Sequence, residues 1–255
     1  MNDKDRFIFL LGGADLEMCA IRQLLDQNGY RYYDKHLRWE NACLSAYRKE
    51  ITDYTGDDTP LWVGIELQED MNFPSNYISI DHHNRNAHKP SSLEQVAELL
   101  EIHLSRQEQL IAANDRAYIP GMKALQASHD EITEIRRRDR MCQGVTEEDE
   151  ALAVKAINEN MEQVNGLIVV KALSSCFSPI CDRLFPYRSL LVYTEREWMY
   201  YGIGADCVLH LFAEDYCRGK LFCGGAPDGY VGTKKAVYTE NQINEMIKKI
   251  SYECT

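Results

Sequence analysis

The chain has 255 residues, which is enough for one large domain or two modest ones. Its content of 45% hydrophobic and 27% charged residues is ordinary for a globular protein. The formal net charge of −12 disfavours binding to long duplex nucleic acids, because such binding needs clustered basic residues. No stretch approaches the roughly 18 consecutive apolar residues of a membrane span. The polar N-terminus is also unlike a secretory signal, so we expect a cytoplasmic protein without a membrane partner.

The cysteines give no metal-binding or redox motif. There are nine of them, scattered and without a CxxC pair. This pattern favours reduced thiols that pack as small core residues.

Strands and helices are predicted to alternate in the N-terminal half. The apolar run Phe7–Leu11 is typical of a buried strand, and the apolar spacing over Leu16–Asn28 predicts a helix that Gly29 ends. Further strands are expected at Tyr30–Tyr33, Leu61–Ile65 and Tyr77–Ile80. A second helix is expected at Arg38–Ile51. A third is expected at about Leu93–Ala113, where a capping box at Ser91–Glu94 begins it. This alternation favours an α/β fold with a Rossmann-like, largely parallel sheet and helices on both faces.

A charged segment with a helical pattern follows, interrupted by Gly144. We expect residues 131–164 to be a helical linker between a first lobe, 1–130, and a second, smaller α/β lobe, 165–255. The basic residues Arg136–Arg138 and Arg140 alternate with acidic ones, which is typical of a solvated helix face. The second lobe is expected to contain strands at Leu167–Val170, Ser189–Tyr193, Trp198–Gly202 and Lys220–Cys223, a helix at Asp206–Tyr216, and a terminal helix from a capping box at Thr239–Gln242 to about Ile250.

The most informative motif is Asp81-His82-His83, at the end of a short predicted strand. Strand ends project side chains into the crevice where open α/β sheets bind their ligands. One imidazole can ligate a metal while the aspartate fixes a ring tautomer. Other acids follow predicted strands or helices, namely Asp15, Glu17, Glu66 and Asp115. Carboxylates and histidines in one crevice suit one or two Mn²⁺ or Mg²⁺ ions, which can generate a water nucleophile near neutral pH.

This order of residues resembles the DHH phosphoesterase superfamily over residues 5 to about 120. The resemblance implies that Asp15, Glu17, His82 and Asp115 ligate metal and that Glu66 bridges the ions. It also implies that His83 meets the substrate phosphate and that Asp81 supports a histidine from behind. The implied activity is that of a Mn²⁺-dependent phosphohydrolase or phosphodiesterase. Its substrate would be small and phosphorylated, such as a short oligonucleotide or a nucleotide phosphodiester, bound in a cleft between the lobes.

The second lobe resembles the substrate-binding domain of the same superfamily, called DHHA1, in a degenerate form. The segment Gly224–Gly232 stands where a GGGH-like loop is found, with Pro227 in place of the histidine. Glycines let backbone N–H groups approach a phosphate closely. The resemblance implies substrate contacts from Gly224, Gly225, Arg218 and Lys220. A glycine-rich surface turn is the alternative.

Several positions depart from the superfamily pattern. Leu11 stands where a histidine is common, and Glu17 and Glu66 replace aspartates. The extra methylene displaces a carboxylate by about 1 Å, and displacements of that size can cost about 100-fold in rate. An alternative function is therefore a catalytically impaired sensor or assembly subunit, in a homo-oligomer or a complex, that binds a nucleotide or phosphate without turnover. Glu66 as the start of an acidic loop and Asn114 as a rival to Asp115 also stay open.

Overall fold

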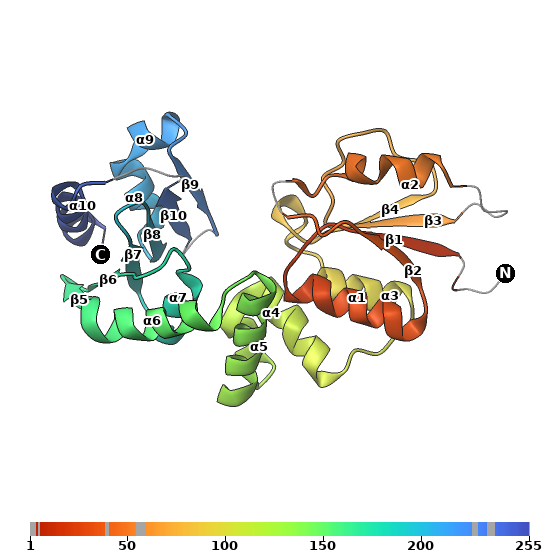
Figure 1. The fold of residues 1–255 in the computed structure, drawn as a ribbon, viewed down its shortest axis with the longest axis horizontal. Helices are drawn as coiled ribbons and strands as arrows, with labels where there is room; N and C mark the ends of the chain where they lie inside the picture. Colours follow the sequence, from red (N-terminus) through yellow and green to blue (C-terminus); the bar gives the residue numbers. More distant parts are fainter. Residues whose placement is uncertain are drawn as a thin grey trace. The chain divides into compact units, whose positions relative to one another are not determined.

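The structure is a computed structural model that describes residue 4 and residues 6–38, 41–54, 60–225, 229–233 and 238–254. Its contacts divide the chain into two compact units, Met1–Gly144 and Val145–Thr255. Each unit is an α/β fold with its own sheet (Figure 1). The predicted fold class, with a Rossmann-like first lobe and a smaller second α/β lobe, is confirmed.

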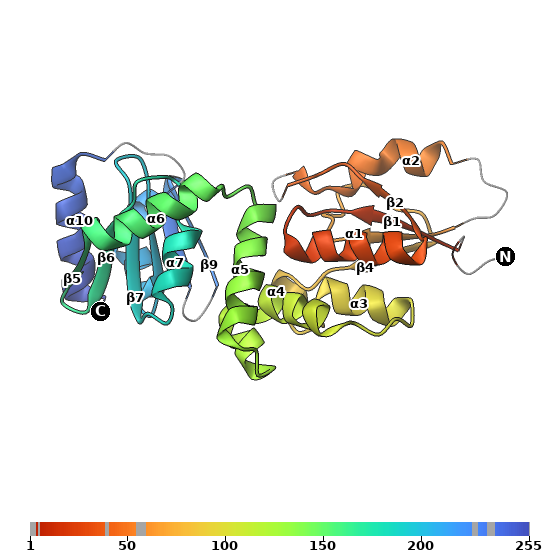
Figure 2. The same ribbon diagram turned by 60° about the horizontal axis from the view of Figure 1, so that its bottom comes forward.

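The first unit is built on a four-stranded sheet in the order β2-β1-β3-β4, and every strand pair in it is parallel. The strands are β1 (Phe7–Leu11), β2 (Arg31–Asp34), β3 (Leu61–Ile65) and β4 (Tyr77–Ile80). The helices are α1 (Leu16–Asn28), α2 (Arg48–Thr52), α3 (Ser92–Leu99), α4 (Arg106–Ala124) and α5 (His129–Cys142), and single 3₁₀ turns lie at Leu44–Tyr47 and Asn84–Asn86. In Figures 1 and 2, α1 and α3 cover one face of the sheet and α2 covers the other.

Burial on both faces explains why β1 is a continuous apolar run. Ile8 and Leu10 pack with Tyr47 and Trp62 in one core cluster. Phe9 is also fully buried, and strand alternation directs it to the opposite face. Parallel strands covered by helices on both sides need apolar residues at every position.

Two predicted helices differ from the structure. The long helix expected from Leu93 is two helices, because α3 ends at Leu99 and a second capping box at Ser105 begins α4. In place of the single helix expected over Arg38–Ile51, a 3₁₀ turn at Leu44–Tyr47 leads into α2, and the N–H of Leu44 donates to the carbonyl of Gln68. Part of that predicted helix, Trp39 and Glu40, lies outside the described residues.

The second unit is built on a six-stranded sheet in the order β5-β6-β7-β8-β10-β9. Its strands are β5 (Met161–Val164), β6 (Leu167–Lys171), β7 (Ser189–Tyr193), β8 (Trp198–Gly202), β9 (Leu221–Gly224) and β10 (Tyr230–Thr233). Its helices are α6 (Glu147–Asn160), α7 (Ser178–Leu184), α8 (Ala205–Leu211), α9 (Ala213–Cys217) and α10 (Glu240–Glu253). The sequence did not predict β5, α7 or β10, and it joined α8 and α9 into one helix.

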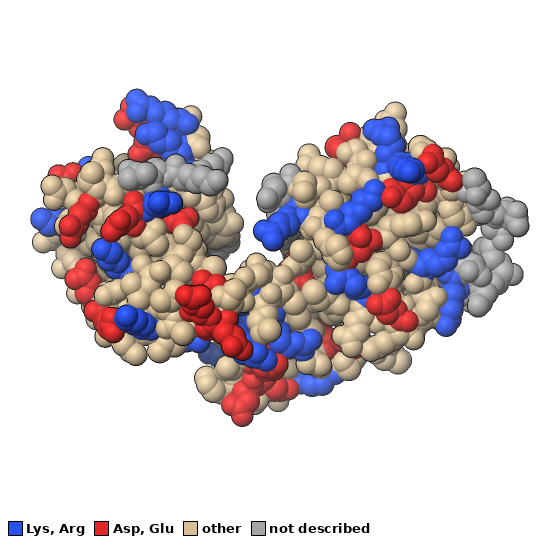
Figure 3. All heavy atoms as spheres, in the orientation of Figure 1, with Lys and Arg blue, Asp and Glu red and all other residues tan. Residues whose placement is uncertain are grey.

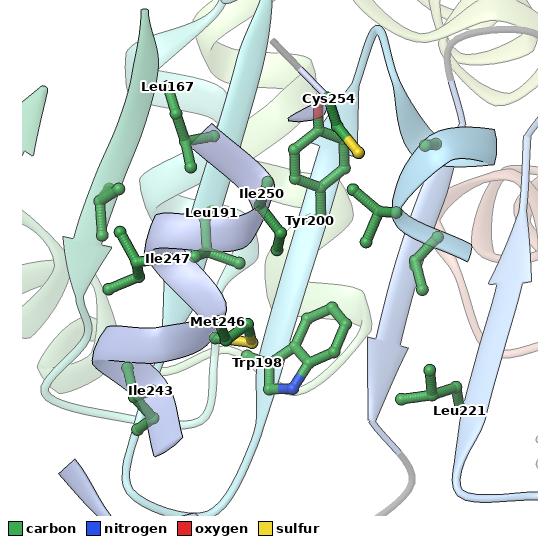
Figure 4. Packing of buried hydrophobic residues seen from close by; sticks show 14 residues of the cluster. Leu167, Leu191, Trp198, Tyr200, Leu221, Ile243, Met246, Ile247, Ile250 and Cys254 are labelled. Atoms are coloured by element: carbon green, nitrogen blue, oxygen red, sulfur yellow. The ribbon is translucent and has the colours of Figure 1, made fainter. Parts of the chain in front are cut away.

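Apolar residues on both faces of this second sheet form its core. On one face, Ile243, Met246 and Ile250 of α10 pack against Trp198 and Tyr200 of β8 (Figure 4). Their spacing of three and four residues is that of one helix face. The opposite face packs on a second buried cluster that includes residues of α6 and α7.

A disulfide joins Cys207 of α8 to Cys254, which follows α10, with Cα atoms 5.6 Å apart. The expectation that the cysteines are all reduced thiols is therefore wrong for this pair. The two residues are far apart in the sequence, and packing of α8 beside α10 brings them together. Seven cysteines are free.

The segment 131–164, expected as a linker, contains most of α5 and all of α6, which belong to different units. Helix α5 packs on α1 and α4, whereas α6 packs on α7 and β6.

On the face that Figure 3 shows, basic and acidic side chains are interspersed in each unit. Within the described residues, no helix is long and apolar enough to cross a membrane.

We expect Leu191→Ala to lower the free energy of unfolding by about 2–5 kcal/mol, because it leaves a cavity in the core of the second unit. Leu191 is fully buried. A matched control is Leu173→Ala, at a side chain that is 41% exposed, which should change stability by less than about 0.5 kcal/mol. Denaturant titration of the full chain measures both. Equal effects of the two substitutions would contradict the assigned core.

Candidate metal centre

The strand register brings the site residues of the first unit to one edge of its sheet. Leu11, Ile65 and Ile80 end three adjacent parallel strands and lie opposite one another in the ladder. The segments that follow these strands therefore begin side by side, at the carboxyl edge where open α/β sheets bind ligands. Gly12 permits the close approach, since a Cβ there would lie 2.4 Å from the carbonyl oxygen of Ile65.

The first turn of α1 supplies two buried acids. Asp15 is the N-cap, and its Oδ1 accepts a hydrogen bond from the N–H of Met18 at 2.9 Å. Glu17 is only 2% exposed, and its Oε1 accepts from the N–H of Leu93, in the first turn of α3, at 3.0 Å. Each carboxylate is thus held at a helix N-terminus, where negative charge is favourable.

Glu66 follows β3 in a left-handed conformation, with a φ of 52°. Such a conformation costs a residue other than glycine about 1–3 kcal/mol and often marks a functional site. Its Oε1 lies 3.5 Å from Nε2 of His83 and 3.7 Å from Nε2 of His82. Glu66 therefore faces the two imidazoles and is not the start of a solvated acidic loop.

His82 is buried and faces carboxylates from three elements. Its Nε2 lies 2.6 Å from Oδ2 of Asp115, 3.4 Å from Oε2 of Glu17 and 3.7 Å from Oε1 of Glu66. Asp115 lies inside α4, whereas the sequence placed it after a helix. Its neighbour Asn114 bonds to α5 instead, through Asp139 and Arg136.

Three of these buried atoms form no hydrogen bond of acceptable geometry, namely Nε2 of His82, Oε2 of Glu17 and Oδ2 of Asp115. The ligand atoms of Glu66, His82, His83 and Asp115 all lie within 4.8 Å of one another. Buried polar atoms without hydrogen bonds are costly, and a cation among them removes that cost. Oxygen and imidazole donors of this kind fit a divalent ion such as Mn²⁺.

His83 is the more exposed histidine, with 25% of its side chain accessible. Asp81 supports it through the backbone, since Oδ1 of Asp81 accepts from the N–H of His83 at 2.9 Å. The other carboxylate oxygen accepts from the side-chain amide of Asn86 at 2.8 Å. Asp81 thus fixes the backbone of the loop after β4 at His83.

Burial and mutual repulsion shift the pKa values of the acids on α1 upward. Burial raises the pKa of Asp15 from 3.8 to about 7, and the carboxylate of Glu66 adds to the rise. Burial also raises the pKa of Glu17 from 4.5 to about 8, although His82 opposes the change. Both carboxyls are therefore poor anions at neutral pH unless a positive charge is added.

The pKa values of both histidines are raised, and a protonated imidazole offsets the repulsion among the carboxylates. Burial by itself lowers the pKa of His82, but the facing carboxylates of Asp115 and Glu17 outweigh burial and raise the pKa to about 10. Burial also lowers the pKa of His83, but Glu66 outweighs it, so this pKa is raised as well. A protonated imidazole thus supplies the positive charge in the metal-free site.

The sequence missed Asp139 of α5, which ties two metal-site elements together. Its side chain is 9% exposed, and Oδ1 accepts from the N–H of Leu16, next to Asp15, at 3.4 Å. Oδ2 accepts from Arg136 at 2.6 Å and from Asn114, next to Asp115, at 3.5 Å. The expected solvated face is therefore wrong for Arg136 and also for Arg140, which is 5% exposed. The only local feature of the sequence that could have indicated this ion pair is the spacing of three residues between Arg136 and Asp139.

The substrate residues expected in the second unit divide into two groups. Gly224 and Gly225 line a cavity of about 210 Å³ beside α8 and β10. Arg218 and Lys220 do not line it, and they pair with Glu214 and Asp215. Pro227, the expected replacement for a loop histidine, lies outside the described residues.

No family model and no curated protein matches the chain. Among solved structures, it is similar to a pGpG-specific phosphodiesterase, PggH from Vibrio cholerae. The TM-score is 0.50 and the identity 13%, over 97% of this chain and 98% of that chain. It is also similar to the DHH domain of a member of a family of ribosomal proteins. There the TM-score is 0.49 and the identity 12%, over 99% of this chain and 88% of that chain.

At 13% identity, the likeness to the phosphodiesterase shows a shared fold. The ordered acids and the Asp81-His82-His83 motif are separate, sequence-based grounds on which the chain resembles the DHH superfamily.

Without a divalent ion, we expect the stability of the protein to fall as pH rises from about 4 to about 10. Asp15 and Glu17 have folded-state pKa values of about 7 and 8, above their ordinary values, so ionising them opposes folding. The pKa of His82, raised to about 10, gives the same sign, because its favourable charge is lost as pH rises. Melting temperatures in EDTA across this range test the direction. Glu17→Gln should flatten the profile, and a wild-type profile that rises with pH would contradict the assignment.

We expect Asp139→Ala to lower the free energy of unfolding by about 3 kcal/mol, since it removes the carboxylate that accepts hydrogen bonds from Arg136 and from the N–H of Leu16. A matched control is the exposed pair Glu134–Arg137 on the same helix, where Glu134→Ala should cost less than about 1 kcal/mol. Equal losses at Asp139 and Glu134, measured by denaturant unfolding, would contradict the anchoring role.

Proposed function

We propose that this chain is a metal-dependent phosphohydrolase of the DHH type that acts on a small phosphodiester. The observation that carries the proposal is the convergence of Glu66, His82, His83 and Asp115 within 4.8 Å at the carboxyl edge of a parallel sheet. Asp15 and Glu17 add two further buried carboxylates at the same edge. When bound, a divalent ion supplies Lewis-acid activation of a phosphoryl oxygen and of water.

The roles of the chain's own residues follow from their surroundings. His82, Asp115 and Glu66 are the ligands in this proposal, and Asp15 and Glu17 complete the set. His83 is the more exposed of the two histidines and lines the neighbouring cavity, so its imidazole contacts a substrate phosphate oxygen in this proposal. Asp81 holds the backbone of His83 in place.

The proposed substrate class rests on a cavity of about 470 Å³ beside His83. Its volume falls within the range of about 300–1,000 Å³ that is usual for small-molecule sites. Arg85 and Asn86 line it together with His83 and Asp81, so it offers donors for a phosphate near the candidate metal ligands. The net charge of −12 also favours a short substrate over a long nucleic acid.

The alternative function is a sensor or assembly subunit that binds a nucleotide or phosphate without turnover. The specific observation in its favour is Leu11, which is fully buried and contributes no ligand where the superfamily commonly has a histidine. Such a protein binds at most one metal ion weakly. Elemental analysis after Mn²⁺ loading separates the two functions, because two ions per chain would count against the sensor.

We expect Mn²⁺-dependent hydrolysis of at least one of four test substrates: bis-p-nitrophenyl phosphate, pApA, pGpG and pyrophosphate. The similar solved structure motivates pGpG. His82→Ala and Asp115→Asn should each lower kcat/KM by at least about 100-fold. Substituting a residue that only hydrogen-bonds to a metal ligand already lowers metal affinity or activity by about 10–100-fold.

The matched control is His88→Ala, at an exposed histidine in the same loop region, which should leave kcat/KM within about twofold. Turnover that survives both substitutions at the site would refute the proposal. Tight ligand binding with no turnover by the metal-loaded wild type would support the sensor instead.

A further inference from the structure

Helix α4 is broken two residues after Asp115. Ala117 and Tyr118 have non-helical backbone angles, and Tyr118 has a φ of 55° and a ψ of −147°. A residue other than glycine adopts such angles at a cost in free energy, so they persist only where the surrounding structure holds them. Pro120 explains the break, because a proline ring clashes with the carbonyl group four residues before it in a continuous helix.

The chain after the break packs tightly against the part of α4 that carries Asp115. A Cβ on Gly121 would lie 2.3 Å from the carbonyl oxygen of Ala113. Any residue other than glycine would therefore force the backbone apart at this contact. The break is thus a packed part of the fold.

Arg136 of α5 contacts residues on both sides of Asp115. Helix α5 packs on α4 (Figure 2). Nη1 of Arg136 donates to Oδ1 of Asn114 at 3.0 Å, and Cζ of Arg136 lies 4.5 Å from the centre of the Tyr118 ring. A guanidinium at that distance is attracted to the face of an aromatic ring. One side chain therefore holds α4 both immediately before Asp115 and at the break that follows it.

The side-chain amide of Asn114 is held at both ends. Its oxygen accepts from Arg136, and its nitrogen donates to Oδ2 of Asp139 at 3.5 Å. Arg136 is 11% exposed and donates to the same Asp139 oxygen at 2.6 Å. Successive residues of a helix point about 100° apart, so holding Asn114 toward α5 also fixes the direction of Asp115. In that direction, Oδ2 of Asp115 lies 2.6 Å from Nε2 of His82.

We propose that Arg136 is a positioning residue for the metal ligand Asp115. Its guanidinium holds both sides of the break in α4 and thereby directs the Asp115 carboxylate toward the candidate metal centre. The inference rests on the proposed function, in which Asp115 is a ligand, but it concerns the binding of the metal and not turnover. Arg136 acts through Asp115 and contacts neither the ion nor the substrate.

A lysine is a poor replacement for this arginine. An ammonium group can still pair with Asp139, but it lacks the planar group that packs on Tyr118 while it donates to Asn114. Arg136→Lys therefore keeps the charge on α5 and removes the contacts that hold the break. Substituting residues that orient metal ligands typically lowers metal affinity about 10–100-fold.

The test measures the Mn²⁺ affinity of the full chain in the absence of substrate. Metal-free protein is titrated with Mn²⁺, and the free ion is measured by electron paramagnetic resonance. We expect Arg136→Lys to raise the dissociation constant of Mn²⁺ by at least about tenfold. Asn114→Ala removes the same contact from the side of α4 and should have an effect of similar size. The matched control is Arg137→Lys, at an exposed arginine of the same helix that pairs with Glu134, which should stay within about twofold of the wild type.

Denaturant unfolding of the same metal-free proteins separates positioning from a merely structural role. A structural role predicts that Arg136→Lys and Asn114→Ala lower stability but bind Mn²⁺ as tightly as the wild type, and that result would overturn the proposal. Tight Mn²⁺ binding by the wild type without hydrolysis of any test substrate would instead contradict the proposed function alone. A wild type that binds no Mn²⁺ would contradict both.

Discussion

The burial of several carboxylates beside one another is the constraint on which the site of this protein depends. Asp15 and Glu17 are both buried, and both have a raised pKa. They persist there because the fold holds each one separately, Asp15 as the N-cap of α1 and Glu17 on the N–H of Leu93. Like charges in a buried pocket oppose folding unless an opposite charge joins them. His82 supplies one positive charge, and a divalent ion supplies more.

The parts of this arrangement that the sequence could predict are those set by local patterns. Apolar runs located β1, β3 and β4, and in a parallel sheet their common ends place Glu66 and His82 at one edge. The parts that it could not predict depend on contacts between distant segments. The hydrogen bond from Leu16 to Asp139 depends on the packing of α5 on α1. The Cys207–Cys254 disulfide depends in the same way on the packing of α8 beside α10.

The departure at Leu11 also has a structural account. Leu11 ends β1, is fully buried, and its carbonyl accepts the hydroxyl of Tyr47 at 2.6 Å. Leu11 therefore packs in the core with its side chain and accepts a hydrogen bond with its backbone, and it offers no metal ligand. The phosphodiesterase of similar structure shares only 13% of its residues with this chain over nearly the full length of both. At that level, apolar patterning maintains the fold, whereas the site must be argued from its own side chains.

The central claim is that the acids and histidines between Asp15 and Asp115 converge on a divalent cation. Anomalous diffraction at the manganese edge, from crystals grown with Mn²⁺ and a phosphate analogue, tests it most directly. The account predicts at least one strong peak within bonding distance of Nε2 of His82 and a carboxylate of Asp115 or Glu66. Manganese peaks confined to surface carboxylates, with none at this edge of the sheet, would contradict it.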